Sequence, residues 1–325
     1  MNVIRFLSII ILLVLVACSP NTGNKRDVIV QATLVSIDKK LPPMHKMTQI
    51  YALDDLLIFY DFMSVDRHFF AYDVINDSSM SWFGKHGNGP GEISNFANIC
   101  FDRKNGILYG LDGNRWQFLG FNVKEAIHNQ DYNPFLKTSL DTTNGRTIVN
   151  MAQYINDSTV ICTIYYDLQK GSNRKNLLGR INLLTGETTA IEKEDPDGEL
   201  FSIAVMPESN RVFMAGKTRD ILKITDFQGN IINTIKGADF RKTRDKQLSY
   251  FSNAISGGGY FFAVFNGKYD SEHSAGKDIL VFDKDGNYLK TLCIDVPIVG
   301  ICYNYMNNRL YVSTDDTPQF GYIQL

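Results

Sequence analysis

The residue types that most often catalyse reactions or bind metals are dispersed along this sequence. The histidines show neither a His-x-x-x-His nor a His-Glu pairing, the spacings typical of zinc sites. They are His45, His68, His86, His128 and His273. The sequence also lacks Gly-x-Ser-x-Gly, the turn that presents a nucleophilic serine. Linear motifs therefore predict no catalytic residue, no metal site and no cofactor.

Two glycine-containing segments resemble ligand-binding loops and are better explained as turns. Gly87-Asn-Gly89-Pro-Gly91 lacks the Lys-Ser/Thr of a phosphate loop, and Pro90 has no N–H to donate. Asp283-Lys-Asp285-Gly-Asn287 begins like a calcium loop, but its twelfth position is Ile294 instead of Glu. We interpret the first segment as a connection between structural repeats and the second as a hairpin turn.

Cys18 is the one residue for which the sequence predicts a covalent modification. Arg5 precedes an apolar run over residues 6–16, shorter than the roughly 20 residues that span a bilayer. This is the layout of a signal peptide. Leu15-Val16-Ala17-Cys18 resembles a bacterial lipobox, in which the cysteine becomes the lipidated first residue. We expect a signal peptide over 1–17, with an ordinary secretion signal as the alternative, and a flexible lipidated tether over 18–27.

One hairpin pattern recurs along the rest of the chain. In the clearest copies an apolar residue is followed nine and ten positions later by an apolar pair, with turn residues between them. Ile99 precedes Leu108-Tyr109 in this way, and Ile301 precedes Leu310-Tyr311. The copies start about 50 residues apart, at Ile50, Ile99, Met151, Ile203, Ser252 and Ile301.

A second hairpin follows the first in each repeat. Its turn begins at an Asp or Asn located 23 residues after the repeat start in three copies and 31 after it in two. These residues are Asp73, Asn122, Asp226, Asn182 and Asp283. Each repeat therefore holds four antiparallel strands, the pattern of a propeller blade. We predict an all-β, six-bladed β-propeller over residues 28–325.

The two ends of the propeller region complement each other. The sixth repeat provides only three strands and ends with residues 320–325, whereas residues 28–37 form a strand-like run outside the first blade. An open ring would leave an exposed edge that invites aggregation. We therefore predict that residues 28–37 supply the missing outer strand of the last blade.

Candidate binding residues lie in loops that share one face of such a propeller. Arg115 and Arg219 each follow their repeat start by 16 residues, so they should occupy equivalent places in blades two and four. Arg with Tyr and Trp is the mixture that dominates binding hot spots. The candidates are Arg67, Arg115, Trp116, Tyr166, Arg219 and Tyr269. The alternative is that these loops are polar because they face solvent, and that their Arg and Asp residues pair with each other.

The net charge and the surroundings of the cysteines give two further expectations. The net charge is −2, and a basic face of the kind that binds nucleic acid is not predicted. Cys100, Cys162, Cys293 and Cys302 lie in apolar, strand-like surroundings, so we expect buried thiols, although export would permit disulfides.

The Asp-x-x-Gly-Asn turns and the segment Phe83-Gly-Lys-His-Gly-Asn-Gly-Pro-Gly-Glu92 resemble the TolB-like or NHL-like six-bladed propeller lipoproteins of Gram-negative bacteria. The resemblance covers residues 28–325 and implies an architecture, with no catalytic residues to carry over. It implies a binding or assembly module held to the outer membrane through Cys18, on its periplasmic face or at the cell surface. The partner would be an envelope protein, a peptide or a glycan. The alternative is a hydrolase, lyase or lactonase with its active site at the channel mouth.

Overall fold

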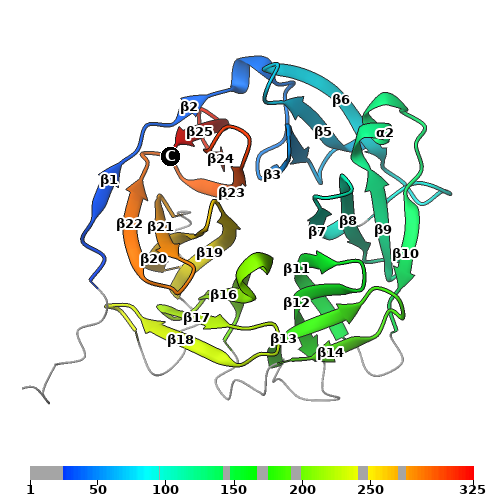
Figure 1. The fold of residues 1–325 in the computed structure, drawn as a ribbon. Helices are drawn as coiled ribbons and strands as arrows, with labels where there is room; N and C mark the ends of the chain where they lie inside the picture. Colours follow the sequence, from blue (N-terminus) through cyan, green and yellow to red (C-terminus); the bar gives the residue numbers. More distant parts are fainter. Residues whose placement is uncertain are drawn as a thin grey trace, which may run out of the picture.

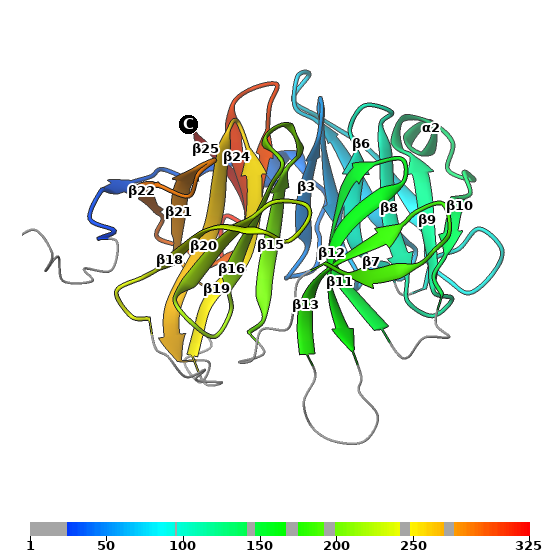
Figure 2. The same ribbon diagram turned by 60° about the horizontal axis from the view of Figure 1, so that its bottom comes forward.

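The computed structural model describes residues 25–94, 96–141, 147–166, 175–191, 199–240, 248–269 and 276–325. In this part of the chain six β-sheets stand around a central axis, with the first strand of each sheet innermost (Figures 1 and 2). This is the predicted six-bladed propeller. None of the helices in these ranges is both long and apolar enough to cross a membrane.

Each blade is an antiparallel sheet whose strands run outward in chain order. Blade one holds β3 (Gln49–Leu53), β4 (Leu56–Tyr60), β5 (Arg67–Asp73) and β6 (Ser78–Lys85). Blade two holds β7 (Phe96–Asp102), β8 (Ile107–Asp112), β9 (Gln117–Asn122) and β10 (Phe135–Ser139). Blade three holds β11 (Thr147–Asn156), β12 (Thr159–Tyr166), β13 (Lys175–Asn182) and β14 (Thr188–Ala190).

The remaining blades follow the same order. Blade four holds β15 (Phe201–Met206), β16 (Arg211–Gly216), β17 (Ile221–Thr225) and β18 (Ile231–Lys236). Blade five holds β19 (Leu248–Gly257), β20 (Tyr260–Tyr269), β21 (Asp278–Asp283) and β22 (Tyr288–Cys293). Blade six holds β23 (Ile298–Asn304), β24 (Arg309–Thr314) and β25 (Phe320–Gln324). All six predicted repeat starts fall within the innermost strands.

The predicted turn residues close the outer hairpins through their side chains. In four of the five, a side-chain oxygen accepts the backbone N–H two residues later, which stabilises the turn locally. The N···O distance is 2.8 Å from Asp73 to Ile75, 2.9 Å from Asn182 to Leu184, 2.9 Å from Asp226 to Gln228 and 2.9 Å from Asp283 to Asp285. The Asp283 segment is thus a hairpin turn, as the sequence indicated.

Asn122 begins a helix instead of a turn, and the sequence did not predict it. Its side chain accepts the N–H of Glu125 and caps α2 (Val123–His128). Val123, Ala126 and Ile127 are buried against blades one and two. At six residues, α2 is too short for its apolar spacing to indicate a helix.

The N-terminal run closes the ring, but over two blades. β2 (Val35–Ser36) pairs antiparallel with β25 as the outer strand of blade six, which confirms the predicted closure. β1 (Ile29–Gln31) instead adds a parallel fifth strand to β22 of blade five. The chain reaches blade six only after passing blade five, so residues 28–37 cannot form one strand along β25.

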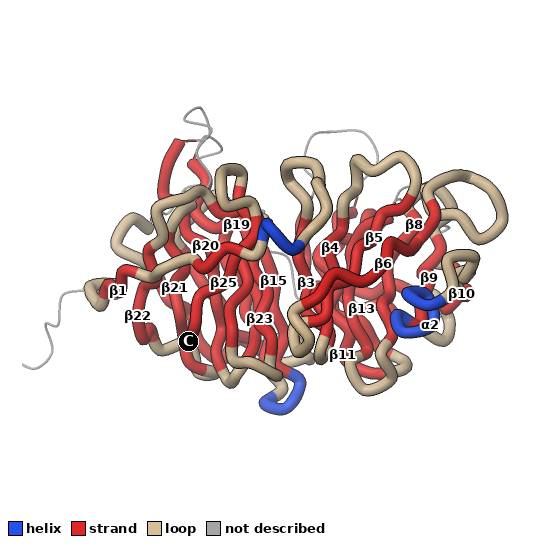
Figure 3. The backbone as a smooth tube through the Cα atoms, turned by 90° about the horizontal axis from the view of Figure 1, so that it is seen from above, coloured by secondary structure: helices blue, strands red, loops and turns tan. Residues whose placement is uncertain are grey.

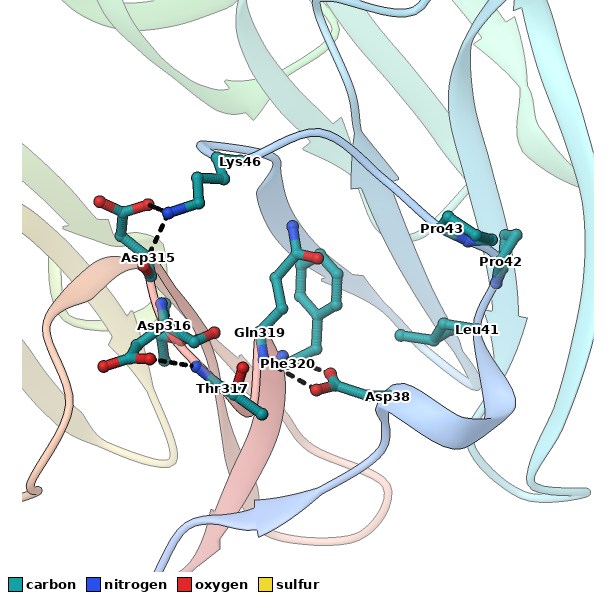
Figure 4. A pocket seen from close by; sticks show the side chains of 11 residues that line it. Asp38, Leu41, Pro42, Pro43, Lys46, Asp315, Asp316, Thr317, Gln319 and Phe320 are labelled. Carbon is teal, nitrogen blue, oxygen red and sulfur yellow. Dashed lines mark hydrogen bonds and ion pairs between the residues drawn. The ribbon is translucent and has the colours of Figure 1, made fainter.

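A carboxylate fastens this closure. Asp38, at the start of the 3-10 helix η1 (Asp38–Lys40), accepts the backbone N–H groups of Gln319 and Phe320 at 2.8 and 2.7 Å (Figure 4). Beside it Lys46 forms an ion pair with Asp315 at 3.2 Å. These residues line a cavity of about 440 Å³ between blades six and one.

Arg26, near the end of the predicted tether, packs onto the propeller. Its guanidinium lies 2.7 Å from the buried carboxylate of Asp220 and 5.6 and 5.2 Å from the ring centroids of Phe251 and Phe265. Burial raises the pKa of Asp220, and the Arg26 charge opposes that shift. The chain is therefore fixed to blades four and five before β1 begins.

The cysteines agree with the expectation of thiols. Cys100, Cys162 and Cys302 are buried and free, while Cys293 is free and half-buried. Burial raises the pKa of Cys293 to about 11. The first three belong to the apolar clusters that hold neighbouring blades together.

Candidate ligand site in the central channel

A cavity of about 970 Å³ occupies the axis of the propeller. It is lined by residues of the innermost strand of every blade and by the loops at both ends of those strands. We call the face formed by the loops between second and third strands the upper face, and the opposite one the lower face (Figure 3). The sequence could not reveal this cavity, because its wall is assembled from six repeats.

Irregularities in four of the innermost strands shape the channel wall. The strand register shifts within β7, β11, β19 and β23. A bulge of this kind inserts an unpaired residue and redirects its side chain. The residues at these shifts, Asn98, Met151, Ser252 and Val299, all line the channel.

Asn98 connects two of these bulges. Its Oδ1 accepts the N–H of Met151 at 2.9 Å, and its Nδ2 donates to the carbonyl of Val149 at 2.8 Å. Asn98 and Met151 adopt left-handed backbone conformations, with φ of 56° and 53°. For a residue such as Met this costs about 1–3 kcal/mol and persists only where surrounding contacts enforce it. Such strain is concentrated at binding sites, so this wall of the channel is a candidate ligand site.

The middle of the channel is neutral and offers free polar groups. The side chains of Gln153, Ser252 and Asn253 make no hydrogen bond to another described residue. Burial raises the pKa of the Tyr51 and Tyr60 phenols, which therefore remain protonated. Amides and hydroxyls beside aromatic rings can orient a polar, uncharged chain without a net electrostatic cost.

The two mouths of the channel differ in character. At the upper mouth Met47 and Phe62 line the cavity and are 51% and 47% exposed, and Met63 follows in the same loop at 54%. At the lower mouth the lining includes Arg103, Lys104 and Glu208, all of which are exposed, and Tyr305. The channel is thus apolar at one end and charged at the other, with two cations to one exposed carboxylate.

The structure places Arg115 and Arg219 in the equivalent loops predicted for them, between the second and third strands of blades two and four. The Arg115 guanidinium donates to the carbonyls of Asn88, Gly89 and Glu92 at 2.8–3.2 Å, and lies 3.3 Å from the Asp112 carboxylate. It thereby holds the glycine-rich connection between blades one and two. Residues 87–91 lie between β6 and β7 and are therefore the connection between blades that the sequence predicted.

Arg219 is buried, at 5% exposure, with its Nε 3.0 Å from the carboxylate of Glu199. The Glu199 carboxylate also accepts the N–H and hydroxyl of Thr218 at 2.7 and 2.8 Å. Sequence alone could not separate this buried pair from an exposed loop arginine.

The other four candidates are distributed around the upper face. Arg67 donates to the carbonyl of Gln130 at 2.7 Å. Trp116, at φ 55°, packs against the core between blades two and three. Tyr166 and Tyr269 end β12 and β20, and their side chains lie outside the described residues, as does Cys18. The four candidates with described side chains, Arg67, Arg115, Trp116 and Arg219, thus have different neighbours.

Three histidines that look unrelated in the sequence meet at the upper end of blade one. His45 Nδ1 lies 2.9 Å from the buried carboxylate of Asp61, and the rings of His68 and His86 stack at 4.6 Å. Burial lowers the pKa of His68. Across the described ranges, no group of three or more His, Cys, Asp or Glu side chains is arranged to hold a metal ion.

Residues 26–305 match a protein family described as TolB-like 6-blade propeller-like. The chain belongs to this family. The match covers all but the last part of blade six, in agreement with the sheets described above. No curated protein matches the chain.

Solved structures similar to this TolB-like propeller share its fold at low sequence identity. A DUF4221 family member from Bacteroides vulgatus is 14% identical with a TM-score of 0.66, covering 92% of this chain and 98% of its own. A gluconolactonase from Xanthomonas campestris is 11% identical with a TM-score of 0.58, covering 94% and 98%. A calcium-binding protein, regucalcin, from Agrobacterium tumefaciens is 10% identical with a TM-score of 0.56, covering 91% and 96%. At these identities the similarity establishes the fold alone.

Proposed function

We propose that this protein is an exported lipoprotein whose propeller is a binding module, with the central channel as its ligand site. The supporting observation is a cavity of about 970 Å³ whose wall combines the unbonded side chains of Gln153, Ser252 and Asn253 with aromatic rings. Ligand sites commonly have this size and this mixture of apolar and sparse polar groups. The ligand would be a peptide or glycan segment, or part of another envelope protein.

Filling the channel should abolish binding without unfolding the protein. Ser252 is exposed to the channel, so Ser252→Trp adds an indole to the cavity and displaces ligand. Ser78→Trp is the matched control, because Ser78 is also exposed but lies on the outer strand of blade one, away from the channel lining. Thermal-shift screening of neutral peptides and oligosaccharides should give stabilisation with wild type and the control only. Equal stabilisation of all three proteins would place the ligand elsewhere.

The anchor is proposed from Cys18. With Cys18→Ala the protein should move from the membrane to the soluble fraction, since a diacyl anchor contributes about 0.8 kcal/mol for each buried CH₂. Cys293→Ala, at a half-buried free thiol, should leave the protein with the membranes. We place the anchored protein on the periplasmic face of the outer membrane, with the cell surface as the other outcome of protease accessibility on whole cells. Membrane retention of Cys18→Ala would contradict the anchor.

An enzyme at the channel mouth is the second candidate. It is favoured by the half-exposed His45 ring, which Asp61 holds through Nδ1 at 2.9 Å, leaving Nε2 free of described partners. An imidazole oriented in this way can act as a general base. The fold similarity to a gluconolactonase suggests lactones as first substrates. Lactone hydrolysis that His45→Gln abolishes would favour the enzyme over the binding module.

A further inference from the structure

The lower mouth of the channel carries two cations without a carboxylate partner. Arg103 and Lys104 are exposed in the loop between β7 and β8, and neither forms an ion pair with a described residue. Glu208 also lines this mouth, but it is exposed and forms no ion pair with either cation. The nearest acid in sequence, Asp102, is engaged elsewhere. Its carboxylate accepts from Asn105 Nδ2 at 2.7 Å and from the Tyr154 hydroxyl at 3.1 Å.

Arg103 is held over the mouth by an aromatic contact. Its guanidinium carbon lies 5.2 Å from the ring centroid of Tyr305, which belongs to blade six, while Arg103 belongs to blade two. The contact therefore spans the lower end of blade one. A guanidinium stacked on a ring loses little conformational freedom when it binds a carboxylate, because it is already oriented. Its five N–H donors match a carboxylate in bidentate geometry.

The opposite mouth offers an apolar surface to the other end of a ligand. The described large apolar side chains exposed on the upper face, Met47, Phe62, Met63 and Val65, all belong to blade one and its preceding connection. Met47 and Phe62 also line the channel. Between the two mouths lie the neutral amides and hydroxyls of the wall.

We propose that the channel binds an elongated amphiphile, with a carboxylate at Arg103 and Lys104 and an apolar end at Met47 and Phe62. This inference rests on the proposed function and adds the ligand's polarity and its direction in the channel. The carboxylate could belong to a peptide C-terminus or to a fatty acid, since both present the same charged group on an apolar chain.

Matched acid and neutral probes test the inference by isothermal titration calorimetry. One pair is N-acetyl-Leu-Ala-Ala as the free acid and as the C-terminal amide, and the other is octanoate and 1-octanol. We expect the acid of one pair to bind at least about tenfold more tightly than its neutral partner. The pair that shows the difference identifies the source of the carboxylate. The preference for the acid should weaken as the salt concentration rises, because Arg103 and Lys104 are exposed.

Substitutions at Arg103 and Lys104 distinguish the effect of their charge on binding from the effect of the shape of the channel. Arg103→Gln with Lys104→Gln should reduce the affinity for the acid about tenfold or more and leave that of the neutral partner unchanged. Lys39→Gln with Lys124→Gln removes the same charge from exposed positions outside the channel lining and should change neither affinity.

Three results would overturn the inference. The first is equal affinity for the acid and the neutral probe in both pairs, and the second is that neither acid binds. The third is that the Arg103→Gln, Lys104→Gln variant binds the acid and the neutral probe more weakly by the same factor. The proposed function is judged separately. It survives if the neutral probes bind and Ser252→Trp abolishes that binding, and it fails if that substitution is without effect on every ligand found.

Discussion

Deleting residues 28–37 is expected to leave the protein aggregated or largely unfolded. The deletion removes β1, β2 and the buried Ile37. It breaks backbone hydrogen bonds to blades five and six, among them Thr291 N to Val28 O at 2.8 Å and Ile37 N to Phe320 O at 3.0 Å. It also exposes the free edge of β25, which can then pair with another chain. The loss of stability should exceed the 0.5–3 kcal/mol typical of a point substitution.

Thermal denaturation and size-exclusion chromatography measure this effect. Two point variants test whether it depends on residues of the run that are buried. Ile37→Asp places a carboxylate at a position that is 5% exposed, whereas Ile29→Asp makes the same change at 65% exposure in the same run. Burying an unpaired charge is costly, and leaving it in water is not. Ile37→Asp should therefore lower the melting temperature markedly and Ile29→Asp only slightly. An unchanged melting temperature in the deletion variant would show that the ring does not depend on this closure.

The architecture was predictable because each blade repeats the same local physics. Asp73, Asn182, Asp226 and Asp283 close their hairpins with contacts two residues away, so the sequence displays them directly. The parallel pairing of β1 with β22 was not predictable in this way, because it joins residues about 260 positions apart and leaves no turn signal. α2 was missed for a related reason, since its stability depends on burial between two blades.

The candidate site was much less predictable than the fold. Asn98, Met151 and Ser252 line the channel because bulges place them there, and a bulge in a strand of mixed residues has no distinct sequence pattern. The loops that the sequence favoured are polar, as expected, but polarity does not distinguish a free guanidinium from an engaged one. Arg115 holds the carbonyls of a neighbouring connection, and Arg103, a lysine-flanked residue in a short turn, was not singled out at all.

Arg219→Met is expected to destabilise the protein by about 1.5–3 kcal/mol, because the buried carboxylate of Glu199 loses a charged hydrogen-bond donor. Glu199 is 0% exposed, so water cannot replace that donor, although the two hydrogen bonds from Thr218 remain. Arg115→Met is the matched control in the equivalent loop. The Arg115 side chain is 31% exposed, so water can replace its contacts and the expected loss is smaller.

A double-mutant cycle in urea shows whether the Arg219–Glu199 pair is the cause. Glu199→Gln removes the buried charge, so combining it with Arg219→Met should recover part of the stability lost by Arg219→Met alone. Such coupling would identify Arg219 as a structural residue that supports the upper face from within, and charge reversal there would then impair binding by unfolding blade four. If Arg219→Met instead keeps the wild-type urea midpoint but no longer binds ligand, Arg219 contacts the ligand. The upper face is then a binding face, as its loop sequences suggested.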